Sequence, residues 1–193
     1  MLKAFKTEIA PSKEQKEKII RSIGIARFLY NQYIAYNKKL YKMYQRGLLD
    51  NRQKHFVTAK DFDKYVNHNL KIKLPWIDEC GSKARKKALV NAENAFKRFF
   101  DGLAGFPRFK KKSNQDVKLY CPKNNKGDWR IWRHKLMIPT LKQVRLKEFG
   151  YLPVGAKVIN GTVSRKAGRF YVSVVIDIDE KSKYNMLLNP CCI

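Results

Sequence analysis

The spacing of apolar residues changes once along this chain, near Pro107. Before that point apolar residues recur every three or four positions, which predicts helices, and after it they alternate, which predicts strands. The stretch from Asn91 to Lys112 contains the change: an apolar helical face runs into a Gly-Phe-Pro break and then into a basic strand with interleaved aromatic residues. We therefore expect an α+β fold in which helices precede most of the strands.

The pattern of the first half predicts a pair of helices. Ser12 followed by Gln15 is a capping-box pattern, which starts the first helix. Gly24 is expected to separate it from a second helix that closes at Gly47.

Two further helices are expected before Pro107. Thr58 with Asp61 predicts the cap of a third helix. Pro75 stops the chain before a fourth helix, which runs from near Ser82 to about residue 103.

The strands are expected at the start and in the second half of the chain. Residues 2–9 read as one short strand without a neighbour in sequence, so we expect it to pair with the later sheet. The best predicted element is a hairpin, with strands over 157–165 and 169–179 around the turn Lys166-Ala167-Gly168. Shorter strands are expected at 118–121, 130–132, 136–138 and 143–146. The four helices then form an insertion into a small β domain.

The balance of charge favours a polyanionic partner. The 193 residues carry 42 Lys and Arg against 16 Asp and Glu, a formal charge of +26, yet 44% are hydrophobic, which is enough for a packed core. Between Lys83 and Lys112 there are ten Lys or Arg against two acids. A solvated basic face is the alternative explanation of that stretch, and a nucleic-acid backbone is the favoured one.

Other partners and sites find little support. No stretch approaches the roughly 20 apolar residues of a membrane span, and the N-terminus lacks the apolar core of a signal peptide, so we expect a cytoplasmic or nucleoid-associated protein. The cysteines and histidines lack the spacing of a disulfide framework or a zinc site, and no cofactor is expected in this chain: Cys80, Cys121, Cys191, Cys192, His55, His68 and His134.

Five motifs in order give a resemblance that covers roughly residues 3–180. They read GIARFLYNQYIAYNKKLY, LKIKLPWI, NAENAFKRFFDGLAGFPRFKKK, LMIPTLKQVRL and GTVSRKAGRFYVSVVID. Together they resemble the N-terminal half of TnpB, also called OrfB, an insertion-sequence protein linked to transposition and DNA recombination. That family is understood as RNA-guided DNA endonucleases related to the type V CRISPR nucleases and to Fanzor.

The resemblance implies a small, oligonucleotide-binding-like β-barrel, the wedge domain, interrupted by a helical recognition domain. Its first strand would be residues 1–10, the recognition domain 11–105 and the rest of the barrel 106–180, with an irregular tail at 181–193. The implied partners are a guide RNA and double-stranded DNA bearing a short motif next to the target. The alternative is a plain double-stranded DNA binder that acts in transposition or represses a transposon end.

The resemblance also implies that this chain is not an enzyme on its own. The family's RuvC-like nuclease follows the wedge domain and holds two metal ions with three carboxylates. Its Gly-Asp-x-Gly type strand is expected right after Asp179, where this chain reads EKSKYNMLLNPCCI. Asp177 and Asp179 are better explained as a solvated strand edge. Magnesium and the family's zinc element are expected only in the nuclease part, so the chain is interpreted as truncated.

The DNA motif would be read by the fourth helix. Ser82 and Lys86 are expected to project together, with Lys83, Arg85 and Lys87 also exposed. The first two align with base-contacting positions of the family's corresponding helix, although the residue types differ. Thr58 and Lys60 are weaker candidates, and Thr58 fits a helix cap equally well.

The RNA or the guide–target heteroduplex would be held by a separate group of residues. Arg27 and Asn31 match the family's most recognisable helix, in which Tyr30 is more probable as a core residue than as a contact. Trp129 and Trp132 could stack on unpaired bases, and a place in the barrel core is the slightly favoured alternative. The phosphate-contacting cations are Arg108, Lys110, Lys111 and Lys112.

Overall fold

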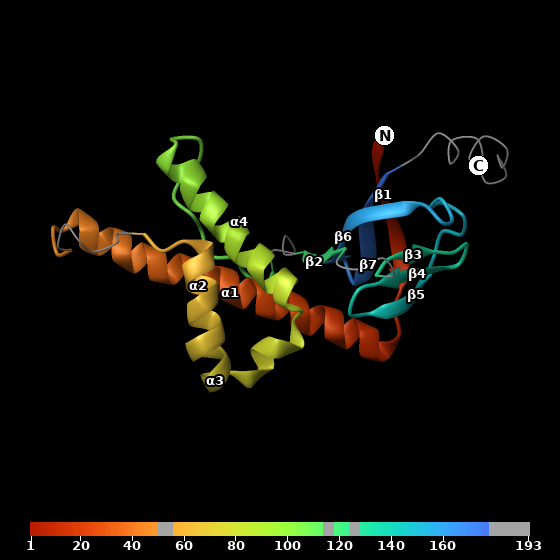
Figure 1. Cartoon of the computed structure of the whole chain (residues 1–193), viewed down its shortest axis with the longest axis horizontal. Helices are drawn as coiled ribbons and strands as arrows, with labels where there is room; N and C mark the ends of the chain where they lie inside the picture. The colour runs from red at the N-terminus through yellow and green to blue at the C-terminus, as the bar shows by residue number, and fades with distance from the viewer. Residues whose placement is uncertain (50–55, 114–117, 124–127, 178–193) are drawn as a thin grey trace. The chain divides into compact units, whose positions relative to one another are not determined.

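The computed structural model describes residues 1–49, 56–113, 118–123 and 128–177. It divides the chain into two compact units (Figure 1). We call them the sheet unit, Met1–Ile20 with the part from Lys118 onward, and the helical unit, Arg21–Val117.

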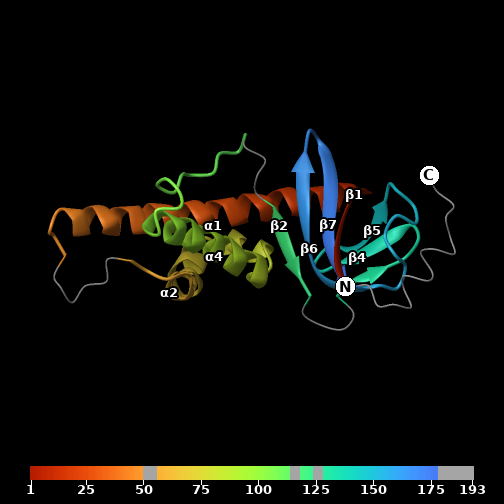
Figure 2. The ribbon, with the colours of Figure 1, turned by 90° about the horizontal axis from the view of Figure 1, so that it is seen from above.

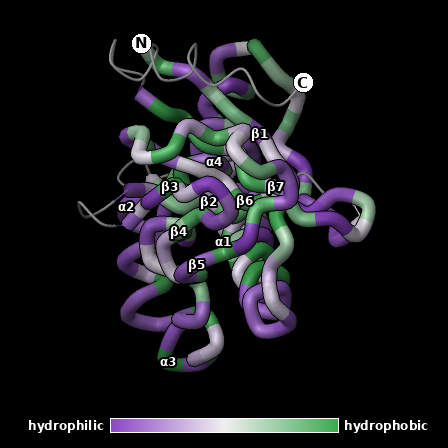
Figure 3. The backbone as a smooth tube through the Cα atoms, turned by 90° about the vertical axis from the view of Figure 1, so that its right-hand side faces the viewer, coloured by the Kyte–Doolittle hydropathy of each residue, from purple (hydrophilic) through white to green (hydrophobic). Residues whose placement is uncertain are grey.

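The sheet unit is built on seven antiparallel strands in the order β2-β6-β7-β1-β5-β4-β3 (Figure 2). The strands are β1 (Leu2–Ala10), β2 (Leu119–Pro122), β3 (Arg130–Ile131), β4 (Lys135–Ile138), β5 (Lys142–Leu146), β6 (Lys157–Lys166) and β7 (Arg169–Asp177). Hydrophilic and hydrophobic residues are interspersed along the backbone in Figure 3. Buried and less buried residues alternate along most of β6 and β7, as a sheet with one buried face requires.

The first strand pairs with strands from the second half of the chain, as predicted. Leu2 lies opposite Asp177 and Ile9 opposite Phe170, so β1 joins the late hairpin to β5. Alternation explains the register, because Phe170, Val172, Val174 and Ile176 are all buried on one face of β7.

The β6–β7 hairpin closes with a turn of two residues, one fewer than predicted, because Lys166 still belongs to β6. Lys166 pairs with Arg169, and Ala167 and Gly168 between them have φ angles of 48° and 78°. Two positive φ angles in a two-residue loop match the twist of the strands, and the glycine adopts its own without strain.

The α+β class is confirmed, whereas closure of the sheet into a barrel is not. Within the described residues, the end strands β2 and β3 each pair with one neighbour only, β2 with β6 and β3 with β4. The described strands therefore form an open sheet.

The helical unit is arranged around α1 (Lys13–Gln45), whose first turns belong to the sheet unit. After it come α2 (Ala59–Tyr65), the π-helical segment η1 (Val66–Leu70), α3 (Lys71–Lys73), the 3-10 segment η2 (Pro75–Glu79) and α4 (Ser82–Phe100). In the described part of the chain no helix is long and apolar enough to span a membrane.

The predicted break at Gly24 is wrong, because α1 passes through it as one helix. A glycine inside a helix costs only about 1 kcal/mol relative to alanine, and burial of Ala26, Leu29 and Tyr33 outweighs that cost. Both predicted ends are confirmed. Ser12 and Gln15 form the capping box with hydrogen bonds of 3.0 and 3.3 Å, and Gly47, with a φ of 66°, follows the C-terminus.

The later helices largely follow the prediction. The backbone amide of Asp61 donates to the Thr58 hydroxyl over 3.2 Å, which confirms that cap. Pro75 does end the preceding helix, and α4 ends at Phe100, earlier than expected, because Gly102 turns the chain with a φ of 70°. The basic strand predicted after Pro107 is wrong, since residues 107–111 form neither a helix nor a strand.

The core of the helical unit is aromatic and centred on Tyr33 of α1. Its ring is fully buried and meets the rings of Phe56, Phe62 and Phe96 edge-on, at centroid distances of 5.3–6.3 Å. Its hydroxyl donates to the carbonyl oxygen of Val57 over 2.7 Å, so the polar end of this ring is satisfied. The ring thereby ties α1 to α2, to α4 and to the segment before α2.

Two glycine substitutions should have opposite effects on stability. A Cβ on Gly161 would lie 2.7 Å from Cζ2 of the buried Trp129, whereas nothing lies within 4 Å of a Cβ on Gly24. Gly161→Ala should lower the free energy of unfolding by about 1–3 kcal/mol through overpacking. Gly24→Ala, the matched control, should raise it by roughly 0.5–1 kcal/mol. Urea denaturation measures both, and an unchanged midpoint for Gly161→Ala would contradict this packing.

Candidate nucleic-acid interface

Residues 108–112, which we call the basic arm, are hydrogen-bonded to α1 through the side chain of Asn31. The Asn31 amide donates to the carbonyl oxygen of Lys110 over 3.0 Å and accepts from the Lys110 backbone amide over 2.9 Å. Both polar atoms of Asn31 are engaged, so it positions the arm. The direct contact of Asn31 with RNA stays a prediction.

Lysine–aromatic contacts hold the same region together. The Lys110 ammonium lies 4.6 Å from the ring centre of Tyr30, and the Lys38 ammonium lies 5.8 Å from that of Phe109. Cations over ring faces are attracted by the ring quadrupole. Tyr30 is buried, as the core interpretation expected, and burial raises the pKa of its hydroxyl, which stays neutral near pH 7.

The other cations of the arm are exposed. Arg108, Lys111 and Lys112 contact no carboxylate within the part of the chain that the structure describes. Their charge is therefore available to an anion. Lys110, the fourth predicted phosphate contact, is half-buried, and the phosphate contacts themselves stay predictions. The segment is not a strand.

A groove of about 450 Å³ opens beside the arm, entirely within the helical unit. The chain reverses after α4, where the backbone amides of Leu103 and Ala104 donate to the Arg98 carbonyl oxygen over 2.8 and 3.1 Å. This reversal returns residues 104–110 alongside α4. The lining contains no acid: it consists of Tyr30, Ala95, Arg98 and residues 104–110.

Arg98 and Lys38 were missed by the sequence analysis. Both belong to helical faces that look solvated, and their closeness to the arm depends on the chain reversal at Gly102. The Gly-Phe-Pro break after residue 104 was the available signal that the chain turns there.

The start of α4 presents the predicted DNA-contacting residues with one exception. Ser82, Lys83 and Lys86 are exposed, and Lys86 approaches the Asp63 carboxylate of α2 within 3.5 Å. The prediction that Arg85 is exposed is wrong, since it is 6% exposed.

Arg85 anchors the turn before α4. Its Nη1 donates to the Asp78 carboxylate over 2.5 Å and to the Ile77 carbonyl oxygen over 3.1 Å. Hydrogen bonds from Lys71 and Arg85 lower the pKa of Asp78, so the carboxylate stays ionised beside the buried guanidinium.

The remaining candidates differ in exposure. Thr58 is used as a cap and donates to the Asp61 carboxylate over 3.0 Å, while Lys60 is exposed. Arg27 is half-buried.

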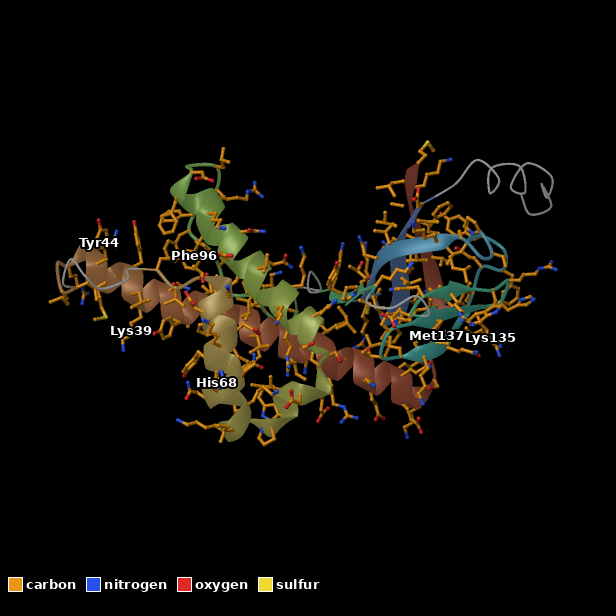
Figure 4. The ribbon with its side chains drawn as sticks, viewed as in Figure 1. Lys39, Tyr44, His68, Phe96, Lys135 and Met137 are labelled. Carbon is orange, nitrogen blue, oxygen red and sulfur yellow. The ribbon has the colours of Figure 1, made fainter. Side chains whose placement is uncertain are left out.

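Figure 4 shows the side chains of Lys39, Tyr44 and His68, three further exposed residues of the helical unit.

The two tryptophans belong to the sheet unit. Trp129 is 5% exposed and packs on Gly161, as the core alternative expected, and its indole Nε1 has no partner among the described residues. Trp132 is 36% exposed, so one ring face can reach a ligand.

The strand-edge explanation does not fit Asp177, because β7 lies between β6 and β1 and Asp177 pairs with Lys157 and Leu2. At the end of this central strand its carboxylate lies 3.3 Å from the N-terminal ammonium. Asp179 lies outside the described residues, as do Cys191 and Cys192. Within the described ranges no three His, Cys, Asp or Glu side chains group closely enough to hold a metal ion.

Comparison with known proteins finds a family model for the start of the chain and relatives over more than half of it. Residues 1–46 match the family model for the helix-turn-helix domain of OrfB from IS605. "Putative RNA-guided DNA endonuclease InsQ" of Escherichia coli K12 is 28% identical over 90% of this chain, and "Virulence protein VsdF" of Salmonella dublin is 31% identical over 58% of it and 95% of its own length. The chain belongs to the TnpB/OrfB family.

Within that family it corresponds to an N-terminal portion. The chain spans about 40% of the length of InsQ and of a "Putative RNA-guided DNA endonuclease" from Streptomyces pristinaespiralis, which is 26% identical. A chain of the Cas12f1-sgRNA-target DNA complex superposes with a TM-score of 0.48 at 14% identity, over 94% of this chain and 50% of that one.

The helix-turn-helix description does not match the local structure of this TnpB-type chain. Residues 1–46 form β1 and the single helix α1, with no turn that divides two helices. The docking of a helix-turn-helix motif, with its second helix in the major groove, is therefore not a model for this region.

Loss of the Asn31 clamp should loosen the basic arm. Asn31→Ala removes both hydrogen bonds to Lys110. Loss of a hydrogen bond that contributes about 1 kcal/mol should make exchange of the Lys110 backbone amide roughly fivefold faster. Hydrogen exchange with mass spectrometry on peptides covering 108–112 measures this. Asn94→Ala, at an exposed position of α4, is the control, and equal protection in both variants would disprove the clamp.

Proposed function

We propose that this chain is the nucleic-acid-binding N-terminal portion of a TnpB-type RNA-guided DNA endonuclease, which binds a guide RNA and a short DNA motif beside the target. The observation that carries the proposal is the basic arm, fixed to α1 by Asn31 next to a groove lined by cations and aromatic rings without an acid. The names of InsQ and of the Streptomyces relative support it.

The arm and the groove suit the RNA. Arg108, Lys111 and Lys112 provide exposed charges on either side of Lys110, whose backbone is held by Asn31, and such charges position a phosphate chain without reading its sequence. The rings beside them suit the unstacked bases of a structured RNA, which a regular duplex does not offer. Trp132, half-exposed on the sheet unit, is a further stacking candidate.

The first turns of α4 suit the DNA motif. Ser82, Lys83 and Lys86 form an exposed polar row at the start of a helix, and a helix is the element that fits the major groove. In RNA-guided systems the protein reads only the short motif, and guide pairing reads the rest. Lys60 is a weaker candidate, and Thr58 weaker still because its hydroxyl is used as a cap.

A plain double-stranded DNA binder is the second candidate function. The exposed residues Ser82, Lys83 and Lys86 on α4 favour this function, because they could contact a DNA duplex without any RNA. Preference between RNA and duplex DNA separates the two functions. We place metal-dependent cleavage, with its magnesium and zinc, in the part of the relatives' length that this chain does not span.

The protein should bind a structured RNA more tightly than duplex DNA of equal length. The reason is that the arm and the rings fit an RNA scaffold, while direct base contacts are confined to one helix. Fluorescence anisotropy at one stated salt concentration, with the RNA transcribed from beside the element that encodes the protein, measures the difference. Equal affinity for random duplex DNA would favour the plain DNA binder.

Neutralising the arm should weaken binding to every sequence alike. Arg108→Ala, Lys111→Ala and Lys112→Ala together should flatten the slope of log affinity against log salt by roughly 2–3, since each phosphate contact contributes about 0.7–0.9. The control removes three exposed lysines from the start of α1, Lys13, Lys16 and Lys18. An equal change in slope in both variants, or a loss confined to some sequences, would contradict the role of the arm.

The chain should not cleave DNA in the presence of Mg²⁺, even when loaded with RNA. Two-metal hydrolysis requires several carboxylates at one point, and Asp63 and Asp78 are engaged with Lys86 and Arg85. A plasmid that carries the adjacent motif, incubated with protein and RNA, is the assay. Linear product that disappears with Asp177→Asn would restore an enzymatic role to this portion.

A further inference from the structure

The groove beside the arm has two kinds of wall. Tyr30, Phe106 and Phe109 provide aromatic surface, and Arg98, Arg108 and Lys110 provide positive charge. Phe109 is 49% exposed, so much of its ring is open to a ligand. A volume of about 450 Å³ lies at the lower end of the range for small-ligand sites, which is roughly 300–1,000 Å³.

We propose that this groove holds a single unpaired nucleotide, with the base on the ring of Phe109 and the phosphate between Arg98 and Arg108. The proposal rests on the function proposed above and names one subsite of it. It differs from the general attraction of the arm for phosphates, because it assigns one base to one place.

The combination of aromatic rings and cations in the groove favours an unpaired nucleotide over other anions. A phosphate chain alone would need the cations but not the rings, and a paired base keeps both faces inside its stack. An unpaired base exposes a π face, which every base has, and an aromatic side chain then contributes a stacking contact that tolerates sequence. An acidic peptide has charge without a large planar group, so it would leave the exposed ring of Phe109 unused.

The groove is formed before a ligand arrives. The Lys110 backbone is held by Asn31, and the turn that returns the chain is bonded to the Arg98 carbonyl oxygen through Leu103 and Ala104. The Lys38 ammonium lies near both phenylalanine rings, 5.9 Å from the centre of Phe106 and 5.8 Å from that of Phe109. A site held in this way loses less conformational freedom on binding.

The test uses hairpin RNAs that differ at one position. One hairpin is fully paired, one has a single-nucleotide bulge, and one has an abasic bulge that keeps the phosphate but lacks the base. The same three are made in DNA to show whether the nucleotide must be a ribonucleotide. Anisotropy titrations use the wild-type chain and two matched variants, Phe109→Ala and Phe149→Ala.

Phe149 is a close control for Phe109. It is 41% exposed and has the Arg145 guanidinium 5.9 Å from its ring centre, yet it belongs to the sheet unit and does not line the groove. Both variants therefore remove one half-exposed ring with a cation beside it.

We expect the bulged hairpin to bind more tightly than the paired and the abasic ones. Phe109→Ala should weaken binding of the bulged hairpin roughly 5- to 150-fold, the usual effect of losing one base–aromatic stack, and should leave the abasic hairpin unchanged. Phe149→Ala should change neither. The competitors are an acidic peptide and a free mononucleotide. If the peptide displaced the bulged hairpin as effectively as the mononucleotide, the assignment would be overturned.

The two proposals fail in different ways. Tight binding of all three hairpins alike, with Phe109→Ala equal to wild type, would overturn the nucleotide subsite and leave the RNA-binding function intact. Absence of binding to any RNA would overturn both.

Discussion

Two asparagine amides on α1 hold the connecting segments of the helical unit in place. Asn37, fully buried, accepts from the Val57 backbone amide over 2.8 Å and donates to its carbonyl oxygen over 3.2 Å. Asn31 does the same to Lys110. Segments without regular structure must find partners for their backbone groups, and a side-chain amide offers both N–H donors and a carbonyl acceptor to them. The segment before α2 and the basic arm are thus fixed to the same helix, and the aromatic core around Tyr33 and the groove depend on those positions.

Because the chain has 16 Asp and Glu for 42 Lys and Arg, most of its cations cannot have a carboxylate partner of their own. In the helical unit Asp78 pairs with Lys71 and with the buried Arg85, and Glu93 lies 3.8 Å from Lys97, so these carboxylates stabilise helices and turns. Lysines near the arm are placed over rings instead, where the attraction does not require a carboxylate. Arg108, Lys111 and Lys112 contact no carboxylate within the described residues, and a polyanion would relieve their repulsion. Burial raises the pKa of the Cys80 thiol to about 11, so this thiol stays protonated and adds no negative charge near pH 7.

Local patterns were enough to predict most of the elements, and tertiary contacts decided the rest. The capping box at Ser12, the helix end at Gly47 and, to within one residue, the hairpin turn follow from conformational preferences within a few residues, and all were predicted. The continuity of α1 through Gly24 was not, because a penalty of about 1 kcal/mol is smaller than the packing of the residues around it. The burial of Arg85 depends on Asp78 in a different segment, and the groove depends on a chain reversal; neither leaves a periodic signal.

The magnitude of the clamp indicates how much of the arm is ordered in advance. Fixing the backbone of one residue costs about 1–2 kcal/mol, and each net hydrogen bond returns about 0.5–1.5 kcal/mol. The two bonds from Asn31 therefore offset the ordering of roughly one or two residues, which are Lys110 and its immediate neighbours. Arg108 lies two residues away, on the wall of the groove, and Lys111 and Lys112 extend beyond it. The Asn31 clamp therefore helps to form the groove in advance, whereas Lys111 and Lys112 become ordered only when a ligand binds. A nucleic acid would meet a fixed site for one nucleotide next to an adaptable site for its phosphate backbone.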